Sequence, residues 1–507
     1  MSASICAATT LGLESLSVEV EVDVLTGGLH SFIVVGLPDT AVKESRERVS
    51  AALKNSGYKP VHQSGRITVN LAPADVPKNS PLFDVAIALG YLQAIGSVSF
   101  ESKNKLFLGE LALDGRIRKV QGVLPITLFA QKAGFEEIYV PEENVEEALL
   151  VKGMRVFGCA ELTDLVDHVS GSKVMNEAVS KLVEAIGQEF SLDHDLSHIV
   201  GQDQAKRALE VAAAGGHNII FTGTPGSGKT LLARALPAIL PPLTFEEGLE
   251  VTKIYSVAGL VKNGQLLTVR PFRSPHHTAS LTSLVGGGSF PKPGELSLAH
   301  RGVLFLDEFS LFPRNVLESL RQPLEEGFVT VSRVRGTHFF PARVMLVAAM
   351  NPCPCGFSGD PERTCSCSAY QVLKYSQKIS GPILDRIDIQ VQVPRVPIHK
   401  LDDASIREKS SEVRERVLAA RERQKERFQE SAILTNAEMS SALTKKHVIL
   451  DAPTKEFLQL AAVQLQLSAR GYMRILKVAR TIADLEASET VLQAHIAEAL
   501  QYRFQHE

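Results

Sequence analysis

Alternating apolar and polar residues near the amino terminus predict a small α+β domain. Residues 13–25 (LESLSVEVEVDVL) and 66–73 (RITVNLAP) alternate with the period of two that is typical of a half-buried β-strand. Residues 43–54 (KESRERVSAALK) carry apolar positions at helical spacing, and residues 83–95 (FDVAIALGYLQAI) are apolar on nearly every side, as in a buried helix. We therefore expect an α+β domain over residues 1–165.

A second pattern, an apolar strand that runs into a glycine-rich loop, predicts a nucleotide site. Residues 219–222 (IIFT) are apolar and β-branched, the next eight residues read GTPGSGKT, and the following LLARAL has helical spacing. In this strand–loop–helix setting, backbone N–H groups and the helix N-terminus surround phosphate oxygens. Lys229 is expected to reach the β- and γ-phosphates, and Thr230 to hold Mg²⁺. The predicted phosphate-binding residues are Gly223, Thr224, Pro225, Gly226, Ser227, Gly228, Lys229 and Thr230.

Two further apolar strands end in polar residues that suit ATP hydrolysis. The run at 302–306 (GVLFL) delivers Asp307, expected to coordinate Mg²⁺, and Glu308, expected to polarise the attacking water. An ordinary buried strand with an acidic turn would look the same in isolation, and the phosphate loop upstream favours the catalytic interpretation. The strand at 342–350 (ARVMLVAAM) ends in Asn351, whose amide would orient the water or would simply belong to an Asn-Pro turn.

Beyond these strands the chain is predicted to be helical. The P-loop core is expected over residues 191–396, after a weakly patterned connector over 166–190. Residues 397–430 are dense in charge with apolar residues at helical intervals, which predicts a long exposed helix between core and lid. Residues 431–507 are expected to form a small helical lid. The fold class is therefore α/β, with an α+β domain in front.

Composition narrows the function classes. At 507 residues the chain has room for about three domains, and 44% hydrophobic with 22% charged residues is ordinary for a globular protein. The net charge of −3 argues against a uniformly basic, histone-like protein, although a local basic channel is compatible with it. No apolar run approaches the roughly 20 residues of a membrane span, and the first residues lack a secretory signal pattern. We therefore expect a cytoplasmic protein with six reduced cysteines and no membrane partner.

Two tracts of the core contain several cations and no Asp or Glu, namely residues 256–294 and 327–359. Within the second tract, residues 327–342 have the pattern of a hairpin. Basic, acid-free loops suit contacts with nucleic-acid phosphates, although for any single arginine a solvated loop is the simpler interpretation. His276 and His277 would contact DNA or cap local structure. The DNA-binding candidates are Lys262, Arg270, Arg273, Arg333 and Arg335, and the tracts also contain Lys292 and Arg343.

Four of the six cysteines form two Cys-x-Cys pairs within a short loop: Cys353 with Cys355, and Cys365 with Cys367. Clustered thiols in a reducing compartment predict a tetrahedral Zn²⁺ site, and the alternative is a loop with four reduced structural thiols. Cys6 and Cys159 stand apart and are interpreted as small buried hydrophobes.

The amino-terminal domain resembles the proteolytic domain of ATP-dependent Lon proteases and its non-proteolytic relatives. The match rests on Gly109–Gly122 (GELALDGRIRKVQG) and Lys78–Gly90 (KNSPLFDVAIALG). By this match the Ser-Lys dyad would fall near Leu82 and at Leu124, so the resemblance implies a Lon-like (ribosomal-protein-like) fold without peptidase chemistry. Ser80, close to the first position, is interpreted as a turn or helix cap.

Nearly the whole chain resembles the magnesium chelatase-like AAA+ proteins of the ComM/YifB type. The specific stretches are RPFRSPHHTASLTSLVGGG, PKPGELSLAHRGVLFLDE, LRQPLEEG, PARVMLVAAMNPCPCG, SGPILDRIDI and VARTIADL. The resemblance implies an AAA+ core with a C-terminal helical lid, acting as a hexameric, ATP-driven DNA helicase that promotes branch migration and integrates single-stranded DNA during natural transformation. The implied partners are single-stranded and branched DNA, further copies of the chain, and recombinase or competence proteins.

The same resemblance implies roles that the local pattern leaves open. Gln202 would belong to the segment that packs over adenine, and Asn351 would be the sensor 1 residue. Arg386 would be an arginine finger that reaches the ATP of a neighbouring subunit, whereas composition alone favours a surface Arg–Asp pair. Arg470 would be the sensor 2 residue, with Arg474 one turn further as the alternative.

Three other functions have specific sequence arguments against them. A metal-insertion motor for a tetrapyrrole is disfavoured by the Lon-like domain, which the resemblance does not assign to chelatase motors. A chaperone-like protein remodeller would carry an aromatic pore loop, but residues 240–251 (LPPLTFEEGLEV) offer only Phe245 beside several acids. Proteolysis lacks its dyad. The preferred hypothesis is an ATP- and Mg²⁺-dependent DNA translocase, with a chelatase-like or chaperone-like remodeller as the alternative.

Overall fold

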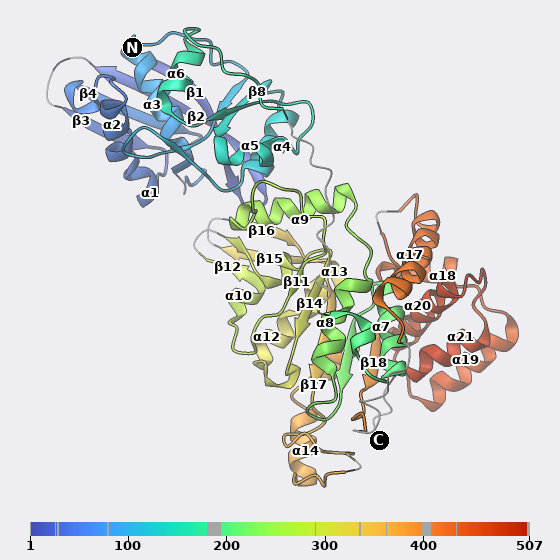
Figure 1. The fold of residues 1–507 in the computed structure, drawn as a ribbon. Coiled ribbons are helices and arrows are strands. Elements are labelled where there is room, and N and C mark those ends of the chain that lie inside the picture. Colours follow the sequence, from blue (N-terminus) through green and yellow to red (C-terminus); the bar gives the residue numbers. More distant parts are fainter. Residues whose placement is uncertain are drawn as a thin grey trace.

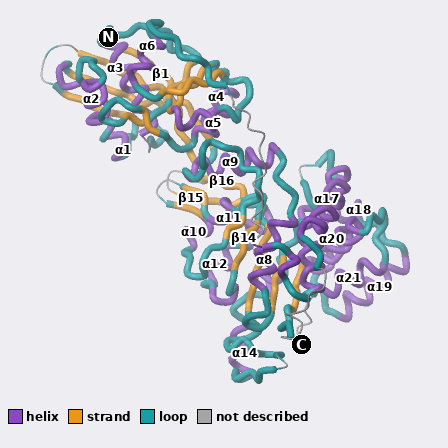
Figure 2. Tube along the Cα trace, in the orientation of Figure 1, coloured by secondary structure: helices purple, strands orange, loops and turns teal. Residues whose placement is uncertain are grey.

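The computed structural model describes residues 2–25, 27, 30–78, 81–179, 194–288, 291–333, 336–360, 362–397, 407–431 and 433–503. Three parts follow one another along the chain in Figure 1: an α+β domain, a core around a parallel sheet, and a group of helices. Figure 2 shows that the strands are confined to the first two parts, and the described residues beyond 407 form helices and loops alone. The predicted α/β fold class is confirmed.

The amino-terminal domain contains a four-stranded sheet, a three-stranded sheet and the two-stranded β6–β7 pair, and burial alternates along β2 and β4 as the sequence predicts. The first has the strand order β1-β2-β4-β3 and is antiparallel except for the parallel β3–β4 pair, and the second is parallel with the order β5-β8-β9. In β2, Val18, Val20, Val22 and Val24 are buried, and this strand packs against the buried helix α3. The strands are β1 Ser2–Leu11, β2 Glu14–Leu25, β3 Ser31–Val35, β4 Arg66–Ala72, β5 Lys105–Phe107, β6 Glu110–Leu111, β7 Ile117–Arg118, β8 Glu137–Pro141 and β9 Arg155–Cys159. The helices are α1 Thr40–Lys43, α2 Ser45–Asn55, α3 Asp84–Ala94, α4 Val123–Lys132, α5 Val145–Ala148 and α6 Leu162–Val169.

Both positions of the expected Lon-type dyad are apolar and inaccessible. Leu82 and Leu124 are buried. Asp84, two residues after Leu82, is also buried and is paired with Arg48 (Nε to Oδ2 2.6 Å). Neither leucine can act as a nucleophile or as a base, so the domain lacks the Ser-Lys chemistry at these positions. Ser80 lies outside the described residues.

The second part is built on a five-stranded parallel sheet with the order β11-β14-β17-β10-β18. Successive residues of each strand enter apolar clusters on opposite faces: Ile219 and Phe221 pack with α7, α8 and the lid, whereas Ile220 packs with α9 and α12. Burial on both faces explains why these strands are continuous apolar runs in the sequence. The strands are β10 Ile219–Thr222, β11 Phe272–Arg273, β14 Val303–Leu306, β17 Met345–Met350 and β18 Ile389–Gln392.

Two hairpins and nine helices of the described chain surround this sheet. The hairpin predicted in the second acid-free tract is confirmed, since Phe328 pairs with Pro341 and Arg333 with Gly336. The hairpins are β12–β13 (Gly286–Gly287 and Lys292–Pro293) and β15–β16 (Phe328–Arg333 and Gly336–Pro341). The helices are α7 Asp203–Gly215, α8 Lys229–Ile239, α9 Phe245–Ala258, α10 Leu281–Val285, α11 Glu295–Leu298, α12 Arg314–Ser319, α13 Arg321–Glu326, α14 Ala369–Ser376 and α15 Gly381–Leu384.

The third part corrects the expectation of an exposed linking helix. Helix α17 packs against α7, α8 and α20 and buries Val413, Val417 and Ala420. Charged residues outnumber the apolar residues of this helix, so the sequence pattern predicted a helix exposed to solvent. Residues 398–406 of the expected segment lie outside the described residues. The helices are α17 Ser410–Arg427, α18 Ser441–His447, α19 Ala452–Gln464, α20 Ala469–Leu485 and α21 Gln493–Gln501.

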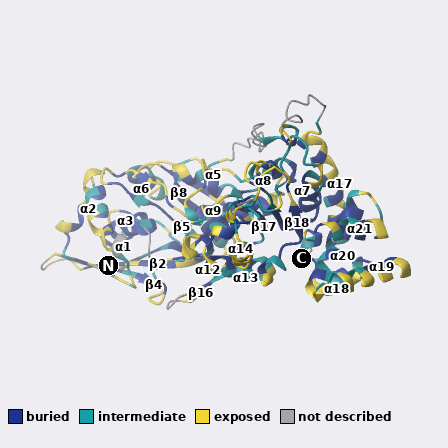
Figure 3. Cartoon of the chain, turned by 90° about the horizontal axis from the view of Figure 1, so that it is seen from below, coloured by how far each residue is buried: buried dark blue, intermediate teal, exposed yellow. Residues whose placement is uncertain are grey.

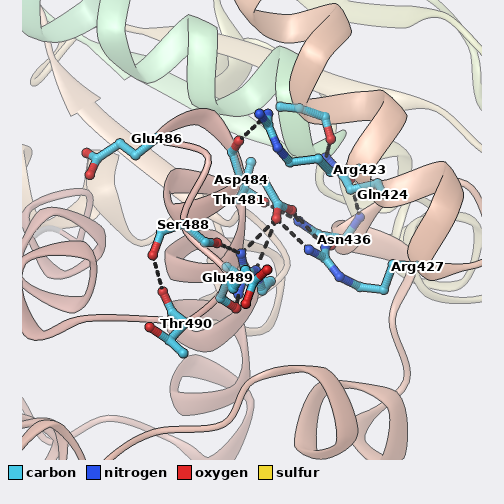
Figure 4. A network of polar contacts seen from close by, with 12 residues as sticks. Arg423, Gln424, Arg427, Asn436, Thr481, Asp484, Glu486, Ser488, Glu489 and Thr490 are labelled. Atoms are coloured by element: carbon cyan, nitrogen blue, oxygen red, sulfur yellow. Dashed lines mark hydrogen bonds and ion pairs between the residues drawn. The ribbon is translucent and has the colours of Figure 1, made fainter.

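A buried carboxylate holds these helices together (Figure 4). Asp484 of α20 is fully buried and accepts hydrogen bonds from Arg427 of α17 at 2.5 and 2.8 Å, from Arg480 at 2.9 and 3.1 Å, and from Asn436 at 2.8 Å. A buried charge with this number of donors is compensated, whereas removal of its partners would leave it costly. In Figure 3 exposed residues lie along α18 and α19 of the same helical part.

The amino-terminal domain is docked on the core through α4 and α9. Gly122 N donates to Ser256 O at 3.2 Å, and Ser256 Oγ donates to Glu147 Oε1 at 2.5 Å. Leu13, in the β1–β2 turn, joins the apolar cluster of the core that includes Phe340 of β16. The β1–β2 turn and α4 therefore connect the first domain to α9 and to the β15–β16 hairpin.

Packing of the first domain continues past the expected boundary at residue 165. Helix α6 extends to Val169, and Ala178 N donates to Val156 O at 2.8 Å. Residues 180–193, which include the second part of the expected connector, lie outside the described residues. Among the described residues, no helix combines the length and apolar character that a bilayer crossing requires.

Candidate functional site

The predicted phosphate loop lies between the end of β10 and the start of α8. Gly226 and Gly228 have φ values of +79° and +95°, a left-handed backbone that residues with a β-carbon rarely adopt. Lys229 Nζ lies inside the loop and donates to the carbonyl oxygens of Gly223 and Thr224 at 2.8 Å each. Burial lowers the pKa of Lys229 from its usual value. The lysine is thus held at the centre of the loop.

Two hydroxyl groups of the loop indicate that it fits a polar ligand. Thr224 Oγ1 and Ser227 Oγ are buried and have no hydrogen-bond partner among the described residues. A buried hydroxyl without a partner costs about 1–3 kcal/mol, which a ligand with acceptor oxygens would offset. These hydroxyls, the glycine backbone and Lys229 together fit the phosphates of a nucleotide.

The groups expected to hold Mg²⁺ meet in front of this loop. Thr230 Oγ1, in the first turn of α8, donates to Asp307 Oδ2 at 2.9 Å, although the two residues are 77 positions apart. Asp307 Oδ1 accepts a bond from the backbone N–H of Glu308 at 2.9 Å. A hydroxyl and a carboxylate are oxygen ligands that suit Mg²⁺, so these two residues fit the ion.

Glu308 has a partner that the sequence interpretation missed. Its backbone is left-handed (φ +51°), and its half-exposed carboxylate lies 3.0 Å from Nδ1 of His277. The histidine belongs to the first acid-free tract, and β11 of that tract pairs with β14, which ends at Leu306, two residues before Glu308. His276 instead bonds Thr278 (Nδ1 to Oγ1 2.8 Å) and stacks on His277. The local sequence SPHH contains a signal for a polar contact, but nothing in it identifies the partner.

A cavity of about 440 Å³ opens between the loop and the two acidic residues. Asn351, which follows β17, lines it, and so do residues of the cysteine loop and of α14. The structure therefore brings Lys229, Asp307, Glu308 and Asn351 to one space at the carboxyl ends of adjacent parallel strands, as expected for an open α/β sheet.

Gln202 connects the phosphate loop to the neighbouring strand. Its backbone is left-handed (φ +60°), and its Nε2 donates to Ser227 O at 3.2 Å and to Pro394 O at 2.6 Å. Ser227 belongs to the loop, and Pro394 follows β18. Gln202 thus lies beside the predicted nucleotide site, where it fixes the loop.

The two arginines expected to stabilise the transition state lie together at the other end of the sheet. Glu325 of α13 binds Arg386 Nη2 through Oε2 and Arg470 Nη2 through Oε1, each at 2.8 Å. Arg386 is buried and also donates to Pro382 O at 2.6 Å and Arg321 O at 3.2 Å. A second cavity, of about 670 Å³, is lined here by Glu325 and Arg470.

These arginines cannot reach the phosphate loop of their own chain in this arrangement. Strand β18 runs parallel to β10, with Ile389 beside Ile219 and Gln392 beside Thr222. Arg386 precedes the start of β18, whereas the loop follows the end of β10. The loop and the arginines therefore lie at opposite ends of the sheet.

Arg474, the alternative sensor 2 residue, is engaged in the interior. Its Nη1 lies 2.5 Å from Oδ1 of the buried Asp388, whose Oδ2 accepts a bond from Asn218 N at 3.0 Å. Although burial alone would raise the pKa of Asp388, the positive charge of Arg474 holds it well below its usual range. Arg474 thus compensates a buried charge, while Arg470 is more than half exposed.

Two of the DNA-binding candidates are paired with acids of the same chain. Arg270 is mostly buried and binds Glu247 (Nη2 to Oε2 2.9 Å) together with the carbonyl oxygen of Arg301 (2.7 Å). Arg273 makes two bonds of 2.7 Å with Glu295. Glu247 and Glu295 lie just outside the acid-free tract of residues 256–294. An arginine within that tract can therefore still be paired with an acid. A DNA contact by Arg270 or Arg273 would have to compete with these ion pairs.

The other candidates are exposed or fall at the limit of the described residues. Lys262 and Lys292 are exposed. Arg333 closes the β15–β16 hairpin opposite Gly336, but its side chain and the whole of Arg335 lie outside the described residues. Arg343 lies 3.2 Å from Glu438 of the third part.

The four clustered cysteines also converge. The Sγ atoms of Cys353, Cys355, Cys365 and Cys367 all lie within 4.8 Å of one another. Cys159 is buried and Cys6 is partly buried, far from this cluster in the amino-terminal domain. The expected donor set of a tetrahedral metal site is therefore assembled.

Family models and relatives cover almost the entire chain. The model described as "Magnesium chelatase, subunit ChlI" matches residues 195–401, "Subunit ChlI of Mg-chelatase" matches 20–144, and the C-terminal model of the same subunit matches 407–503. The "Competence protein ComM" of Haemophilus influenzae is 44% identical over 97% of this chain and 96% of its own length. The YifB protein of Escherichia coli is 41% identical over 97% of this chain and 95% of its own length.

A subunit of magnesium chelatase itself is a more distant relative of this chain than the competence protein. The magnesium-chelatase 38 kDa subunit of Rhodobacter capsulatus is 26% identical, over 64% of this chain and 90% of its own length. The similarity to the competence protein is both closer and nearly full-length. With the P-loop geometry and the parallel sheet, these matches show that the chain belongs to the ComM/YifB family of magnesium chelatase-like AAA+ proteins.

Proposed function

We propose that this protein is an ATP-dependent DNA translocase that assembles as a hexamer and drives branch migration. In this role it integrates single-stranded DNA during natural transformation or recombination, in the cytoplasm and alongside recombinase or competence proteins. Its family supports ATPase activity, and the competence protein of Haemophilus influenzae supports a role connected with DNA uptake.

ATP and Mg²⁺ are the proposed cofactors. The loop residues Gly223 to Thr230 would hold the phosphates, and Thr230 with Asp307 would hold the ion, which neutralises charge on the phosphates. Glu308 would orient and polarise the attacking water, with Asn351 on the opposite side of the same cavity. Gln202 would hold the loop next to the base.

Assembly into a ring is supported by the position of the two arginines. Arg386 and Arg470 lie together at the end of the sheet that is remote from their own phosphate loop. An arginine in that position acts on ATP only when a second subunit presents its loop there. The two arginines would then leave Glu325 and bind the phosphates of the neighbour.

The observation that carries the DNA assignment is the pair of inserted hairpins in basic, acid-free sequence. Hairpin β12–β13 exposes Lys292, and hairpin β15–β16 ends at Arg333, while its outer face exposes Phe339. Both hairpins contact α11, so they emerge from the same region of the core. Cations for phosphates beside an exposed aromatic ring for bases are the combination that single-strand binding requires.

A protein-remodelling function has less support. Phe245, the one aromatic residue of residues 240–251, lies beside the docked amino-terminal domain, with Lys152 Nζ 5.7 Å from its ring centre. A chelatase-like motor keeps one argument in its favour, because a model named after the chelatase subunit matches the amino-terminal domain as well. The amino-terminal domain therefore does not count against a chelatase. What counts against it is that the 38 kDa subunit is only a weak match that covers part of this chain.

ATP turnover with and without single-stranded DNA tests the proposal. We expect DNA to raise the ATPase rate, and Lys229→Ala and Glu308→Gln to abolish migration of a fluorescently labelled four-way junction. A matched pair of variants, Lys292→Glu and Lys455→Glu, separates the hairpin from an exposed lysine of α19. The proposal fails if DNA neither binds nor stimulates turnover while a protein substrate does.

A further inference from the structure

The loop between β17 and α14 is held in shape by sulfur atoms. The Sγ–Sγ distances are 3.3 Å for Cys353–Cys355, 3.7 Å for Cys353–Cys365 and 3.5 Å for Cys355–Cys365. These separations are far too long for disulfides, which need about 2.05 Å. Four sulfurs about 2.3 Å from a tetrahedral zinc ion would lie about 3.8 Å apart, so a small expansion of this cluster accommodates the ion.

Backbone N–H groups of the loop point at the sulfur atoms. Ser358 N donates to Cys353 Sγ at 3.3 Å, and Cys367 N donates to Cys365 Sγ at 3.4 Å. Such bonds stabilise the negative charge that a metal-bound thiolate carries, and they orient the ligands as outer contacts of a metal site do. Each Cys-x-Cys pair therefore supplies two sulfurs and a turn of backbone around them.

The loop between the two pairs has, among its described residues, one ion pair with the core, from Arg395 Nη1 to Glu362 Oε2 at 3.1 Å. Its own contacts are a turn, in which Asp360 Oδ1 accepts the N–H groups of Glu362 and Arg363 at 2.8 and 2.9 Å, and the stacking of Arg363 on Phe357. A segment this short cannot bury enough apolar surface to fix itself, and in small units of this kind a metal replaces the core.

We propose that Cys353, Cys355, Cys365 and Cys367 bind one Zn²⁺ ion in a closed, structural site. Four thiolates satisfy all four positions of tetrahedral zinc and leave no open position for water or substrate. Cys353 is buried and the other three are partly exposed, so thiol-modifying reagents can reach the ligands. This site is independent of whether the protein moves DNA.

The zinc loop would support the nucleotide site. It begins two residues after Asn351, and Pro354 lines the cavity that contains Lys229 and Glu308. A β-carbon added at Gly356 would come within 2.7 Å of the Pro225 ring in the phosphate loop, so the two loops are in contact. After the second pair, α14 returns to the core, where Tyr375 is hydrogen-bonded to Ser310 just beyond Glu308. Loss of the ion would therefore loosen Asn351 and the phosphate loop together.

Metal analysis of the purified full chain tests the proposal. We expect close to one zinc per chain by mass spectrometry, retained through dialysis against EDTA and released when the thiols are modified. Cys365→Ser with Cys367→Ser should lose the ion, and Cys6→Ser, the matched control, should keep it. A protein without zinc, or a double variant that retains it, overturns the proposal, and so does iron in place of zinc.

A second measurement keeps the test valid if the double variant does not fold. Cobalt exchanged into the wild-type chain should give the intense visible bands of tetrahedral Co²⁺ and the near-ultraviolet charge-transfer bands of four thiolates. Bands of octahedral cobalt, or no cobalt uptake, would contradict the four-sulfur site. Binding of a fluorescent ATP analogue before and after metal release then measures the support of the phosphate loop, which we expect to weaken several-fold.

Discussion

The two ends of the ATPase sheet carry different groups: the carboxyl end has the phosphate loop and two acids, and the amino end has two arginines. At the carboxyl end, Lys229, Asp307 and Glu308 face an open cavity whose buried hydroxyls lack partners. At the amino end, Arg386 and Arg470 share the single carboxylate of Glu325, which leaves this cluster with a net positive charge. The carboxyl end therefore suits the binding of phosphates, whereas the amino end offers arginines that could bind the phosphates of another chain. In the proposed ring, a neighbouring copy would bring the two ends together.

The largest effect should come from the amino end. Arg386→Ala is expected to lower the ATPase rate of the assembled protein by about 10³–10⁵-fold, the range for a lost arginine finger. Binding of ATP by the isolated chain should stay unchanged, because Arg386 is remote from its own loop. Glu325 keeps Arg470 as a partner, so the variant should fold. Turnover, nucleotide binding and melting temperature are the measurements, and weakened ATP binding by the isolated chain would contradict the comparison.

At the carboxyl end, Glu308→Gln should lower kcat by about 10²–10⁴-fold, as for a lost general base, with ATP binding retained. The amide keeps the size of the side chain and removes its charge. Single-turnover hydrolysis and equilibrium binding separate the two effects. If ATP binding falls together with kcat, Glu308 contributes to the ground state and its assigned role is wrong.

Substitution of the two candidate sensor 2 arginines should change the free energy of unfolding by different amounts. Arg474→Met leaves the buried Asp388 without its cation, which costs about 3–5 kcal/mol of unfolding free energy. Arg470→Met removes a half-exposed pair, worth at most about 1 kcal/mol, and should instead slow ATP turnover. Urea unfolding and ATPase rates of both variants decide between them. Equal stabilities would show that Arg474 is not structural.

The depressed pKa of Asp388 adds a pH dependence to the same pair. A carboxyl group with a lowered pKa in the folded state stabilises the protein above its unfolded pKa of about 3.9, and this contribution is lost as pH falls below that value. Wild-type protein should therefore lose stability steeply on acidification below about pH 4. Arg474→Met should lose less stability over this pH range, because without the charge of Arg474 the pKa of Asp388 is no longer held low.

The smallest effect should come from the residue that connects Glu308 to the first acid-free tract. His277→Ala is expected to lower kcat by about tenfold with KM unchanged, since a hydrogen bond to a charged group is worth roughly 1.5–3 kcal/mol at most. His277→Asn, which places an N–H donor near the same point, should restore most of the rate. His276→Ala is the matched control, and an equal loss there would assign the effect to the tract as a whole.

Local sequence predicted the carboxyl end of the sheet far better than the amino end. The strands that precede Asp307 and Asn351 are short apolar runs with the polar residue directly attached, and Lys229 follows its strand through the glycine-rich loop, so sequence order determines their place. The contacts of Arg270 with Glu247 and of His277 with Glu308 join residues more than twenty positions apart, across different elements. No periodicity records such pairs, because they depend on how the elements pack.

The burial of α17 was missed for a related reason. Its apolar stripe of Val413, Val417 and Ala420 is narrow, and the charges around it dominate the pattern. What decides its burial is the complementary surface of α7 and α20, which lie some 200 residues before and 50 residues after it in the chain. Patterns identify a helix, while the partner of that helix is a property of the whole fold.

Mixing two inactive variants tests the central claim most directly. Glu308→Gln keeps Arg386 but cannot hydrolyse ATP, and Arg386→Ala keeps an intact carboxyl-end site but offers no arginine. Combined in equal amounts with DNA and ATP, the two should regain a substantial fraction of wild-type ATPase activity, because the arginine of one chain completes the site of the other. A mixture as inactive as its components, although co-assembly is verified, would contradict a site shared between subunits.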